Sequence, residues 1–228
     1  MIEDILPAAV ASADAFEDSE EAFLFPEEEA IVARAVESRR RAFATARACA
    51  RRALGALGLA PVAIPRSEGR APLWPDGVVG SITHCDGYRA AAVARAREVT
   101  ALGIDAEPNA PLREGVLRLV ASAEERARLA DLAAADPAIA WDRLLFSAKE
   151  STYKAWFPLA RRRLGFEDAE LTIDAESGTF GIRLLVPGPV VDGSEIRGFD
   201  GRWLVREGLV VTAIAAPSGP SRDAGGRR

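Results

Sequence analysis

The stretch VVGSITHCDGYRAAAVAR, residues 78–95, decides the fold class predicted for this chain. Both of its ends read as strands, and the CDGY between them contains the Asp-Gly pair that favours a tight hairpin turn. We therefore predict two antiparallel strands, 78–84 and 88–95. A third strand-like run, TALGIDAE at 100–107, follows directly.

A long helix is predicted before this hairpin. Between residues 27 and 57 apolar residues recur at spacings near 3.6, which is the period of a helix with one buried face. Pro26 and the acidic residues after it suit a helix start, and GALGLAP ends the pattern. The Pro- and Gly-rich residues 65–77 are predicted to form a loop.

The second half of the chain repeats the order of helices followed by strands. SAEE at 122–125 has the spacing of a capping box, and a helix is expected over 139–156. Four short strands should follow, at 171–174, 179–186, 202–206 and 209–215. We predict an α+β fold with an N-terminal half at 1–108, a C-terminal half at 109–216 and a disordered tail at 217–228.

Composition excludes several classes of protein. The 228 residues carry a net charge of −5, which argues against a general nucleic-acid binder. Neither a membrane-spanning stretch nor a secretory signal is recognisable, so a cytoplasmic protein is expected. The two cysteines and single histidine cannot form a Cys/His zinc cluster, and no GxGxxG or P-loop pattern occurs. Cys49 and Cys85 are expected to be reduced thiols.

Two acidic residues in GIDAEP (103–108) form a candidate metal site. Side chains alternate along a strand, so Asp105 and Glu107 should point to the same side. Two carboxylates that close together suit Mg²⁺, which prefers oxygen ligands. Taken alone, the pattern also fits two solvated acids on an exposed strand.

The stretch LLFSAKESTYKAW (144–156) holds both lysines of the chain. The protein has 29 Lys and Arg residues, and apart from Lys149 and Lys154 all of them are arginine. Glu150 and Lys154 share a helix face, either as a surface ion pair or as a third carboxylate and an ammonium beside a metal–phosphate site. On such a helix Lys149 lies about a quarter turn from Glu150, so it shares that side only loosely.

The histidine and the arginines leave further alternatives. A lone His84 is most often structural, and Cys85 cannot be its nucleophile partner because adjacent strand residues face opposite ways. Residues 34–52 carry seven arginines against one acid, which fits either a solvated helix face or an anion site.

Four motifs, in this order, resemble those of the 4′-phosphopantetheinyl transferases, in the branch of the enterobactin synthetase D component and the actinobacterial type II enzymes. They are RRRAFATARACARRAL (39–54), PLWPDGVVGSITHCDGYRAAAVA (72–94), LGIDAEP (102–108) and DRLLFSAKESTYKAWFPL (142–159). The resemblance implies transfer of the phosphopantetheine arm of coenzyme A to a serine of an apo acyl or peptidyl carrier protein, with 3′,5′-ADP as the second product. It also implies two similar halves related by a pseudo-two-fold, with coenzyme A in the cleft between them.

The resemblance assigns roles to individual residues. Asp105, Glu107 and Glu150 match the Mg²⁺ ligands of the family, and Lys154 matches the lysine on the diphosphate. Basic residues on the coenzyme A phosphates and adenine side, and a Ser/Thr-His pair beside the nucleotide, match Arg39, Arg47, Arg66, Thr83 and His84. Because Thr83 and His84 would both face the ligand, the chain near His84 is expected to leave regular strand geometry. Arg34, Arg51 and Arg52 are left as surface charge. Three roles stay open for Lys149, which are a phosphate contact, a contact with the carrier protein and surface charge.

Catalysis is assigned to Glu150 and Lys154. Glu150 would accept the proton of the carrier serine, directly or through a metal-bound water, and Lys154 would add positive charge at the diphosphate. The alternatives are a Mg²⁺-dependent coenzyme A phosphohydrolase and a non-catalytic coenzyme A-binding module. A monomer serving siderophore or other secondary metabolism is expected, with the carrier protein itself left unidentified.

Overall fold

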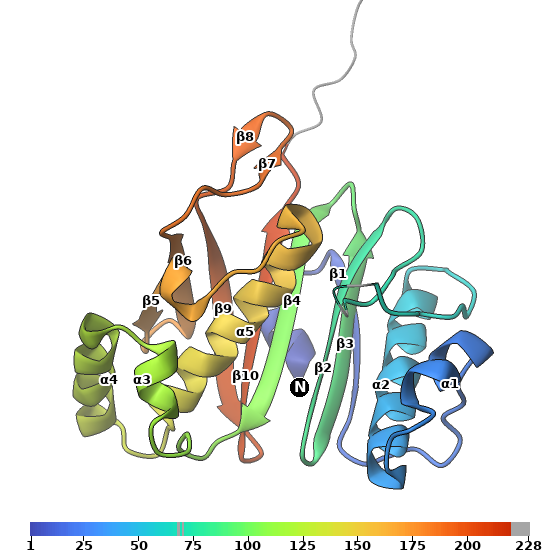
Figure 1. Cartoon of the computed structure of the whole chain (residues 1–228), viewed down its shortest axis with the longest axis horizontal. Helices are drawn as coiled ribbons and strands as arrows, with labels where there is room; N and C mark the ends of the chain where they lie inside the picture. Colours follow the sequence, from blue (N-terminus) through green and yellow to red (C-terminus); the bar gives the residue numbers. More distant parts are fainter. Residues whose placement is uncertain (68, 70, 220–228) are drawn as a thin grey trace, which may run out of the picture.

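The computed structural model of this protein describes residues 1–67, 69 and 71–219. Figure 1 shows two halves side by side, each with helices packed on an antiparallel sheet. The N-terminal half contains η1 (Ile2–Ile5), β1 (Val10–Ala15), α1 (Pro26–Val32), α2 (Glu37–Ala56), β2 (Val78–Cys85) and β3 (Tyr88–Arg95). The C-terminal half contains α3 (Val116–Val120), α4 (Ala123–Ala135), α5 (Trp141–Ala160), η2 (Phe166–Asp168), β5 (Ala169–Asp174), β6 (Thr179–Leu184), β7 (Val190–Val191), β8 (Ser194–Glu195), β9 (Gly198–Arg206) and β10 (Leu209–Pro217).

The predicted α+β class and the strands of both halves are confirmed. β2 and β3 form the expected hairpin, and β1 extends it to a three-stranded sheet of order β1-β3-β2. The C-terminal sheet has the order β4-β10-β9-β6-β5, in which β4 is Val99–Pro108. A division of the chain after residue 108 therefore leaves β4 on the N-terminal side, although its ladder partner is β10.

The helix predicted over 27–57 is wrong in one respect, because it is two helices. The break between α1 and α2 lets α1 fold back along α2. Glu28 of α1 is thereby fully buried, and its carboxylate accepts hydrogen bonds from Arg51 Nη1 at 3.1 and 3.0 Å and from the Ile64 backbone N–H at 3.0 Å. A helix-period pattern does not report such a turn, because tertiary ion pairing produces it.

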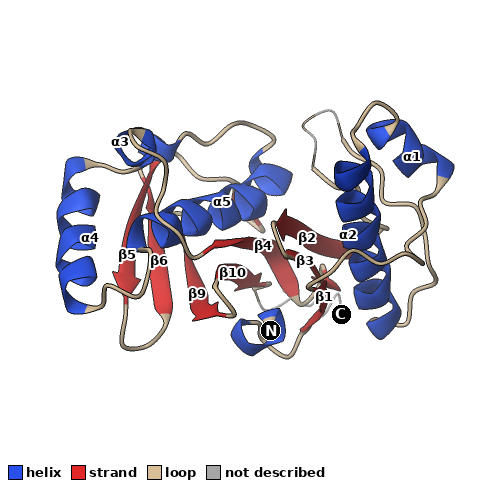
Figure 2. Cartoon of the chain, turned by 90° about the horizontal axis from the view of Figure 1, so that it is seen from below, coloured by secondary structure: helices blue, strands red, loops and turns tan. Residues whose placement is uncertain are grey.

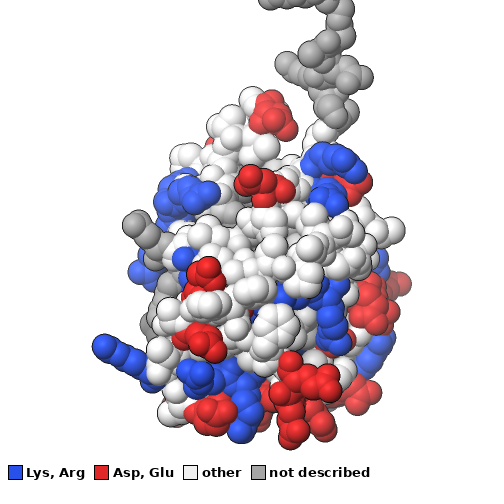
Figure 3. All heavy atoms as spheres, turned by 90° about the vertical axis from the view of Figure 1, so that its right-hand side faces the viewer, with Lys and Arg blue, Asp and Glu red and all other residues white. Residues whose placement is uncertain are grey.

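Arg51 was expected to be surface charge, and that prediction is wrong. Only 6% of the residue is exposed, and its guanidinium lies over the rings of Phe23 and Phe25. Some of the acidic residues before α2 pair with basic residues of the same half, as Asp18 does with Arg89 at 2.8 Å. Figure 3 accordingly shows acidic and basic side chains side by side on the face that lies to the right in Figure 1.

Helix α5 covers the C-terminal sheet and determines where the site lies (Figure 2). Trp141 packs edge-on against Trp203 of β9, with 5.5 Å between ring centroids. Gly103 of β4 lies directly under α5, since a Cβ there would be 1.9 Å from the Ser151 carbonyl oxygen. Only glycine permits this close approach. It brings the next residue on the same strand face, Asp105, beside the second half of α5.

Two smaller predictions have different outcomes. The capping box at 122–125 is confirmed, with Ser122 Oγ accepting from the Glu125 N–H at 3.1 Å and Glu125 Oε2 accepting from the Ser122 N–H at 2.8 Å. Most of the predicted disordered tail lies outside the described residues, while Pro217 ends β10. Among the described residues no helix has both the length and the apolar character that crossing a membrane requires.

Candidate active site

The candidate site lies where the two sheets meet. β2 pairs with β3 and β4 pairs with β10, so that an edge of β2 and an edge of β4 lie next to each other (Figures 1 and 2). We call the contact between these two edges the seam. Here hydroxyl groups of β2 accept hydrogen bonds from backbone N–H groups of β4. The N–H groups of Ile104 and Ala106 donate to Ser81 Oγ and Thr83 Oγ1, each at 3.1 Å.

Asp105 lies at the centre of this seam and is 5% exposed. Its Oδ1 atom accepts hydrogen bonds from Lys154 Nζ at 2.8 Å and from Thr83 Oγ1 at 3.2 Å. Its Oδ2 atom is buried without a hydrogen-bond partner. Because a buried carboxylate oxygen without a partner is costly, such an atom calls for a cation or a donor that is not part of the chain.

The Asp105 charge acts on two further carboxylates. Burial, and after it the negative charge of Asp105, raises the pKa of Glu107 and of Glu150, while Lys154 acts in the opposite direction on both. The three acids predicted from the sequence are therefore close enough to repel one another. In the residues that the structure describes, however, no three carboxylate, imidazole or thiol side chains are arranged to hold a metal ion.

Sequence reasoning missed Arg143, which is the direct partner of Glu107. Its Nη1 atom lies 3.0 Å from Glu107 Oε2, and its other donors reach the carbonyl oxygens of Ala110 at 3.0 Å and Pro111 at 3.2 Å. Arg143 precedes Glu150 by two helical turns, so both lie on one side of α5. That spacing is the sequence signal that could have identified it.

Lys154 reaches the seam from α5. Besides the bond to Asp105, its ammonium donates to the Ile104 carbonyl oxygen at 3.0 Å, and 27% of the side chain is exposed. An ammonium has three N–H donors, so two of them hold Lys154 in place and one remains for a ligand.

A cavity of about 220 Å³ opens beside Asp105 and Lys154. Its wall includes four of the residues predicted to bind the nucleotide, and these are Arg47, Arg66, Thr83 and His84. Arg39 is exposed and is absent from the wall, but its charge acts on His84 and helps to lower the pKa of that residue.

The two arginines in the wall of this cavity pack against one aromatic ring. Arg47 is 3% exposed, its Nε atom donates to the Ile64 carbonyl oxygen at 3.0 Å, and burial lowers its pKa to about 10. Arg47 and Arg66 both lie over the Phe43 ring, at 4.3 and 5.2 Å from its centre. Phe43 thus holds two guanidinium groups together at one wall, which is an arrangement suited to an anion.

The chain is similar to members of one protein family over most of its length. A family model described as the 4′-phosphopantetheinyl transferase N-terminal domain matches residues 27–94, and one described as the 4′-phosphopantetheinyl transferase superfamily matches residues 101–188. The 4′-phosphopantetheinyl transferase Svp of Streptomyces mobaraensis is 56% identical over 228 residues, which cover 98% of this chain and 93% of Svp. The chain belongs to the 4′-phosphopantetheinyl transferase superfamily.

Two further relatives show the range of the superfamily. The 4′-phosphopantetheinyl transferase PptT of Mycobacterium tuberculosis is 46% identical over 94% of this chain and 97% of its own length. Enterobactin synthase component D of Salmonella typhimurium is 33% identical over 64% of this chain and 59% of its own length. The second similarity covers less than two thirds of either protein.

The expected departure from strand geometry at His84 is wrong. β2 continues in regular antiparallel register through Cys85, with Thr83 opposite Ala90 and His84 opposite Arg89. Thr83 points into the seam and is 4% exposed, whereas His84 is exposed at the mouth of the cavity. Both residues line the cavity because β2 is an edge strand of its sheet, and a cavity at that edge can be reached from either face of the strand.

His84 and Cys85 do not form a nucleophile pair. Burial raises the pKa of the Cys85 thiol to about 12, and the charges of Glu107 and Asp105 add to this shift. Although the His84 residue as a whole is exposed, partial desolvation of its ring by the surrounding cavity lowers its pKa, and the charges of Lys154 and Arg39 act in the same direction. The thiol is therefore protonated near neutral pH and is a poor nucleophile.

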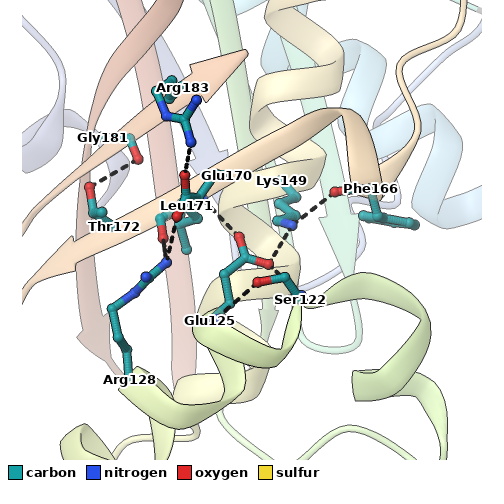
Figure 4. Close-up of polar contacts among 10 residues, drawn as sticks. All are labelled: Ser122, Glu125, Arg128, Lys149, Phe166, Glu170, Leu171, Thr172, Gly181 and Arg183. Atoms are coloured by element: carbon teal, nitrogen blue, oxygen red, sulfur yellow. Dashed lines mark hydrogen bonds and ion pairs between the residues drawn. The ribbon is translucent and has the colours of Figure 1, made fainter. Parts of the chain in front are cut away.

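Lys149 is neither surface charge nor part of the cavity beside Asp105. It is 5% exposed, and its Nζ atom donates to Glu125 Oε2 and to the Phe166 carbonyl oxygen, each at 2.9 Å (Figure 4). Glu125 Oε1 also accepts from the Leu171 N–H at 2.8 Å. The buried pair of Lys149 and Glu125 thus joins α4, α5, η2 and β5 next to Glu150.

A second cavity of about 240 Å³ lies on this other side of Glu150. Its wall consists of Lys149, Glu150, Tyr153, Arg163, Leu164, Gly165, Phe166 and Ala169. Glu150 and Lys154, one helical turn apart on α5, therefore border two different cavities.

Proposed function

We propose that this superfamily member transfers the 4′-phosphopantetheine arm of coenzyme A to a serine of an apo carrier protein and releases 3′,5′-ADP. The observation that carries the proposal is the grouping of Asp105, Glu107, Glu150 and Lys154 between two cavities, one of which is lined by Arg47, Arg66 and His84. Basic side chains suit the phosphates of the nucleotide. The second cavity, with Tyr153, Leu164 and Phe166, suits the thinner, uncharged pantetheine arm.

The chemistry of the residues present fits Mg²⁺, although the described side chains are not grouped around a single ion position in this structure. The buried Oδ2 atom of Asp105 has no hydrogen-bond partner, and burial and mutual repulsion raise the pKa values of Glu107 and Glu150. A divalent cation would bind the Asp105 Oδ2 atom and offset the repulsion between the carboxylates. Carboxylate oxygens are also the ligands that Mg²⁺ prefers. We propose that Asp105, Glu107 and Glu150 hold it. When bound, Mg²⁺ would neutralise charge on the diphosphate.

The reaction exchanges one P–O bond for another. The serine oxygen of the carrier bonds to the phosphorus that bears the pantetheine arm, and the bridging oxygen of the diphosphate leaves with 3′,5′-ADP. We propose that the Glu150 carboxylate accepts the serine proton, because Glu150 borders the second cavity and can meet a group bound there. Arg39, Arg47, Arg66 and His84 are proposed to bind the nucleotide end.

The first experiment is intact-mass spectrometry of an apo carrier protein after incubation with this protein, coenzyme A and Mg²⁺, with EDTA in a parallel sample. A mass gain equal to phosphopantetheine that EDTA abolishes is the expected result. Consumption of coenzyme A without a gain on acyl or peptidyl carriers would indicate the phosphohydrolase instead. Neither gain nor consumption would indicate a protein that only binds coenzyme A.

Lys154→Ala should lower kcat by tenfold or more, which corresponds to about 1.4 kcal/mol of transition-state stabilisation. The substitution removes the point charge that Asp105 and the Ile104 carbonyl oxygen hold at the cavity. Steady-state kinetics with a fixed apo carrier measures the change. Lys154→Arg is the matched control, since it keeps the charge but not the compact ammonium, and it should recover only part of the loss. An unchanged kcat in Lys154→Ala would contradict the assignment.

The carrier protein is proposed to approach the C-terminal half. Arg118 and the 77%-exposed Leu119 lie on α3, and Arg161–Arg163 follow α5. If basic residues steer an acidic carrier, raising NaCl from 50 to about 500 mM should raise KM for the carrier several-fold and leave kcat nearly unchanged. A salt effect confined to kcat would argue against electrostatic steering.

A further inference from the structure

The hydroxyl of Thr83 is already committed within the protein. It donates to Asp105 Oδ1 at 3.2 Å and accepts from the Ala106 N–H at 3.1 Å. A hydroxyl has one proton to donate, and here that proton goes to Asp105. With 4% of the residue exposed, the hydroxyl is poorly placed to contact a phosphate as well.

Ser81 lies two residues earlier on the same face of β2. It shows the hydrogen bond that holds β2 to β4 without a contact to Asp105. Its Oγ atom accepts from the Ile104 N–H at 3.1 Å, and the residue is 3% exposed. Both hydroxyls therefore satisfy a backbone N–H of β4 with the same geometry. The bond to Asp105 is what distinguishes Thr83 from Ser81.

That bond determines how the Asp105 carboxylate is turned. Oδ1 accepts from Lys154 on α5 and from Thr83 on β2, so donors from two different elements hold the same oxygen. Two donors on one oxygen prevent the carboxylate from rotating about its χ2 angle. The other oxygen, Oδ2, is consequently fixed in the buried position where it has no partner.

We propose that Thr83 is a positioning residue for the cation site and not a contact for the nucleotide. It acts through Asp105, by holding Oδ1 so that Oδ2 faces the position of the divalent ion. This inference rests on the proposed function, which places the ion at Asp105. It assigns Thr83 a different role from the one that the resemblance implies.

The test compares Thr83→Val with Ser81→Ala, using Mn²⁺ as the probe ion. Each variant removes one hydroxyl and leaves one β4 N–H without an acceptor. Only Thr83→Val also removes one of the two donors to Asp105 Oδ1. Mn²⁺ affinity is measured by electron paramagnetic resonance of the free ion in the absence of coenzyme A. Affinity for 3′,5′-ADP is measured by calorimetry in EDTA. The melting temperature reports how much each variant weakens the contact between β2 and β4.

Thr83→Val should weaken Mn²⁺ binding by tenfold or more and leave 3′,5′-ADP affinity within about twofold of wild type. Ser81→Ala should lower the melting temperature but keep Mn²⁺ affinity within about twofold. Thr83→Ser, which keeps the hydroxyl, should restore Mn²⁺ binding. If Thr83→Val does not fold, Thr83→Ala removes the same hydroxyl without adding a methyl group in its place, and the same readouts apply.

Three results would overturn the proposal. Equal loss of Mn²⁺ affinity in Thr83→Val and Ser81→Ala would mean that Thr83 serves only the seam. Weaker 3′,5′-ADP binding in Thr83→Val with unchanged Mn²⁺ affinity would make it a nucleotide contact. Absence of Mn²⁺ binding by wild type would remove the ion that Thr83 is said to position. Transfer of phosphopantetheine by wild type is scored separately, so the proposed function can stand when this inference fails.

Discussion

Glu150→Gln should lower kcat for phosphopantetheine transfer by about 10²-fold or more. General-base catalysis contributes factors of about 10² to 10⁴, and the amide cannot accept the serine proton. The substitution preserves shape, and Glu150 is a half-buried residue whose carboxylate pKa is raised by burial and by Asp105. Glutamine should therefore be accommodated without unfolding. Steady-state kinetics with a saturating apo carrier measures the effect.

Two further measurements make this prediction decisive. Affinities for Mn²⁺ and coenzyme A, determined separately, show whether a loss of rate reflects chemistry or binding. Glu176→Gln, an exposed carboxylate in the turn after β5, is the matched control and should retain wild-type kinetics. Normal binding of both ligands together with a wild-type rate in Glu150→Gln would end the assignment of Glu150 as base.

Lys149→Met should lower the free energy of unfolding by about 3 to 5 kcal/mol. The substitution removes the ammonium from a buried pair whose side chains are 3% and 1% exposed, and it leaves the Glu125 carboxylate uncompensated. Two backbone N–H groups, of Ser122 and Leu171, would remain as its only compensation. Urea denaturation followed by far-UV circular dichroism measures the change.

The neighbouring surface pair provides the control. Arg183 is 69% exposed where it contacts Glu170, in the same polar cluster of Figure 4, so Arg183→Met should change the stability little. The double variant Lys149→Met with Glu125→Leu should recover part of the loss, because an apolar pair leaves no buried charge. If Lys149→Met had wild-type stability but bound coenzyme A more weakly, Lys149 would instead be a contact for the coenzyme A phosphates.

Much of the fold could be predicted because it depends on local pattern. The Asp-Gly turn at 86–87, the capping box at 122–125 and the closing strands are each encoded within a few residues, and each is present in the structure. The four motifs likewise identify the superfamily without any knowledge of the tertiary structure. Alternation along β4 predicted that Asp105 and Glu107 point to the same side, and the negative charge of Asp105 helps to raise the pKa of Glu107.

What the sequence could not supply are the partners that lie far away along the chain. Arg51 is buried because α1 folds back to bring Glu28 onto it, 23 residues away. Arg143 contacts Glu107 across 36 residues, and Lys149 contacts Glu125 across 24. No periodicity within a helix reports whether a charged face meets water or an opposite charge on another element, so surface charge and buried ion pair look alike in sequence.

By itself, then, the sequence determined the class of fold, the superfamily and the residue types of the site, because turns, caps and motifs are short-range features. The tertiary structure alone decided which hydroxyl holds Asp105, which cation holds Glu107 and which lysine is free to meet a ligand. These depend on the close packing of α5 over Gly103 and on the meeting of β2 with β4. Contacts between elements are set by packing in three dimensions, and a one-dimensional pattern does not contain them.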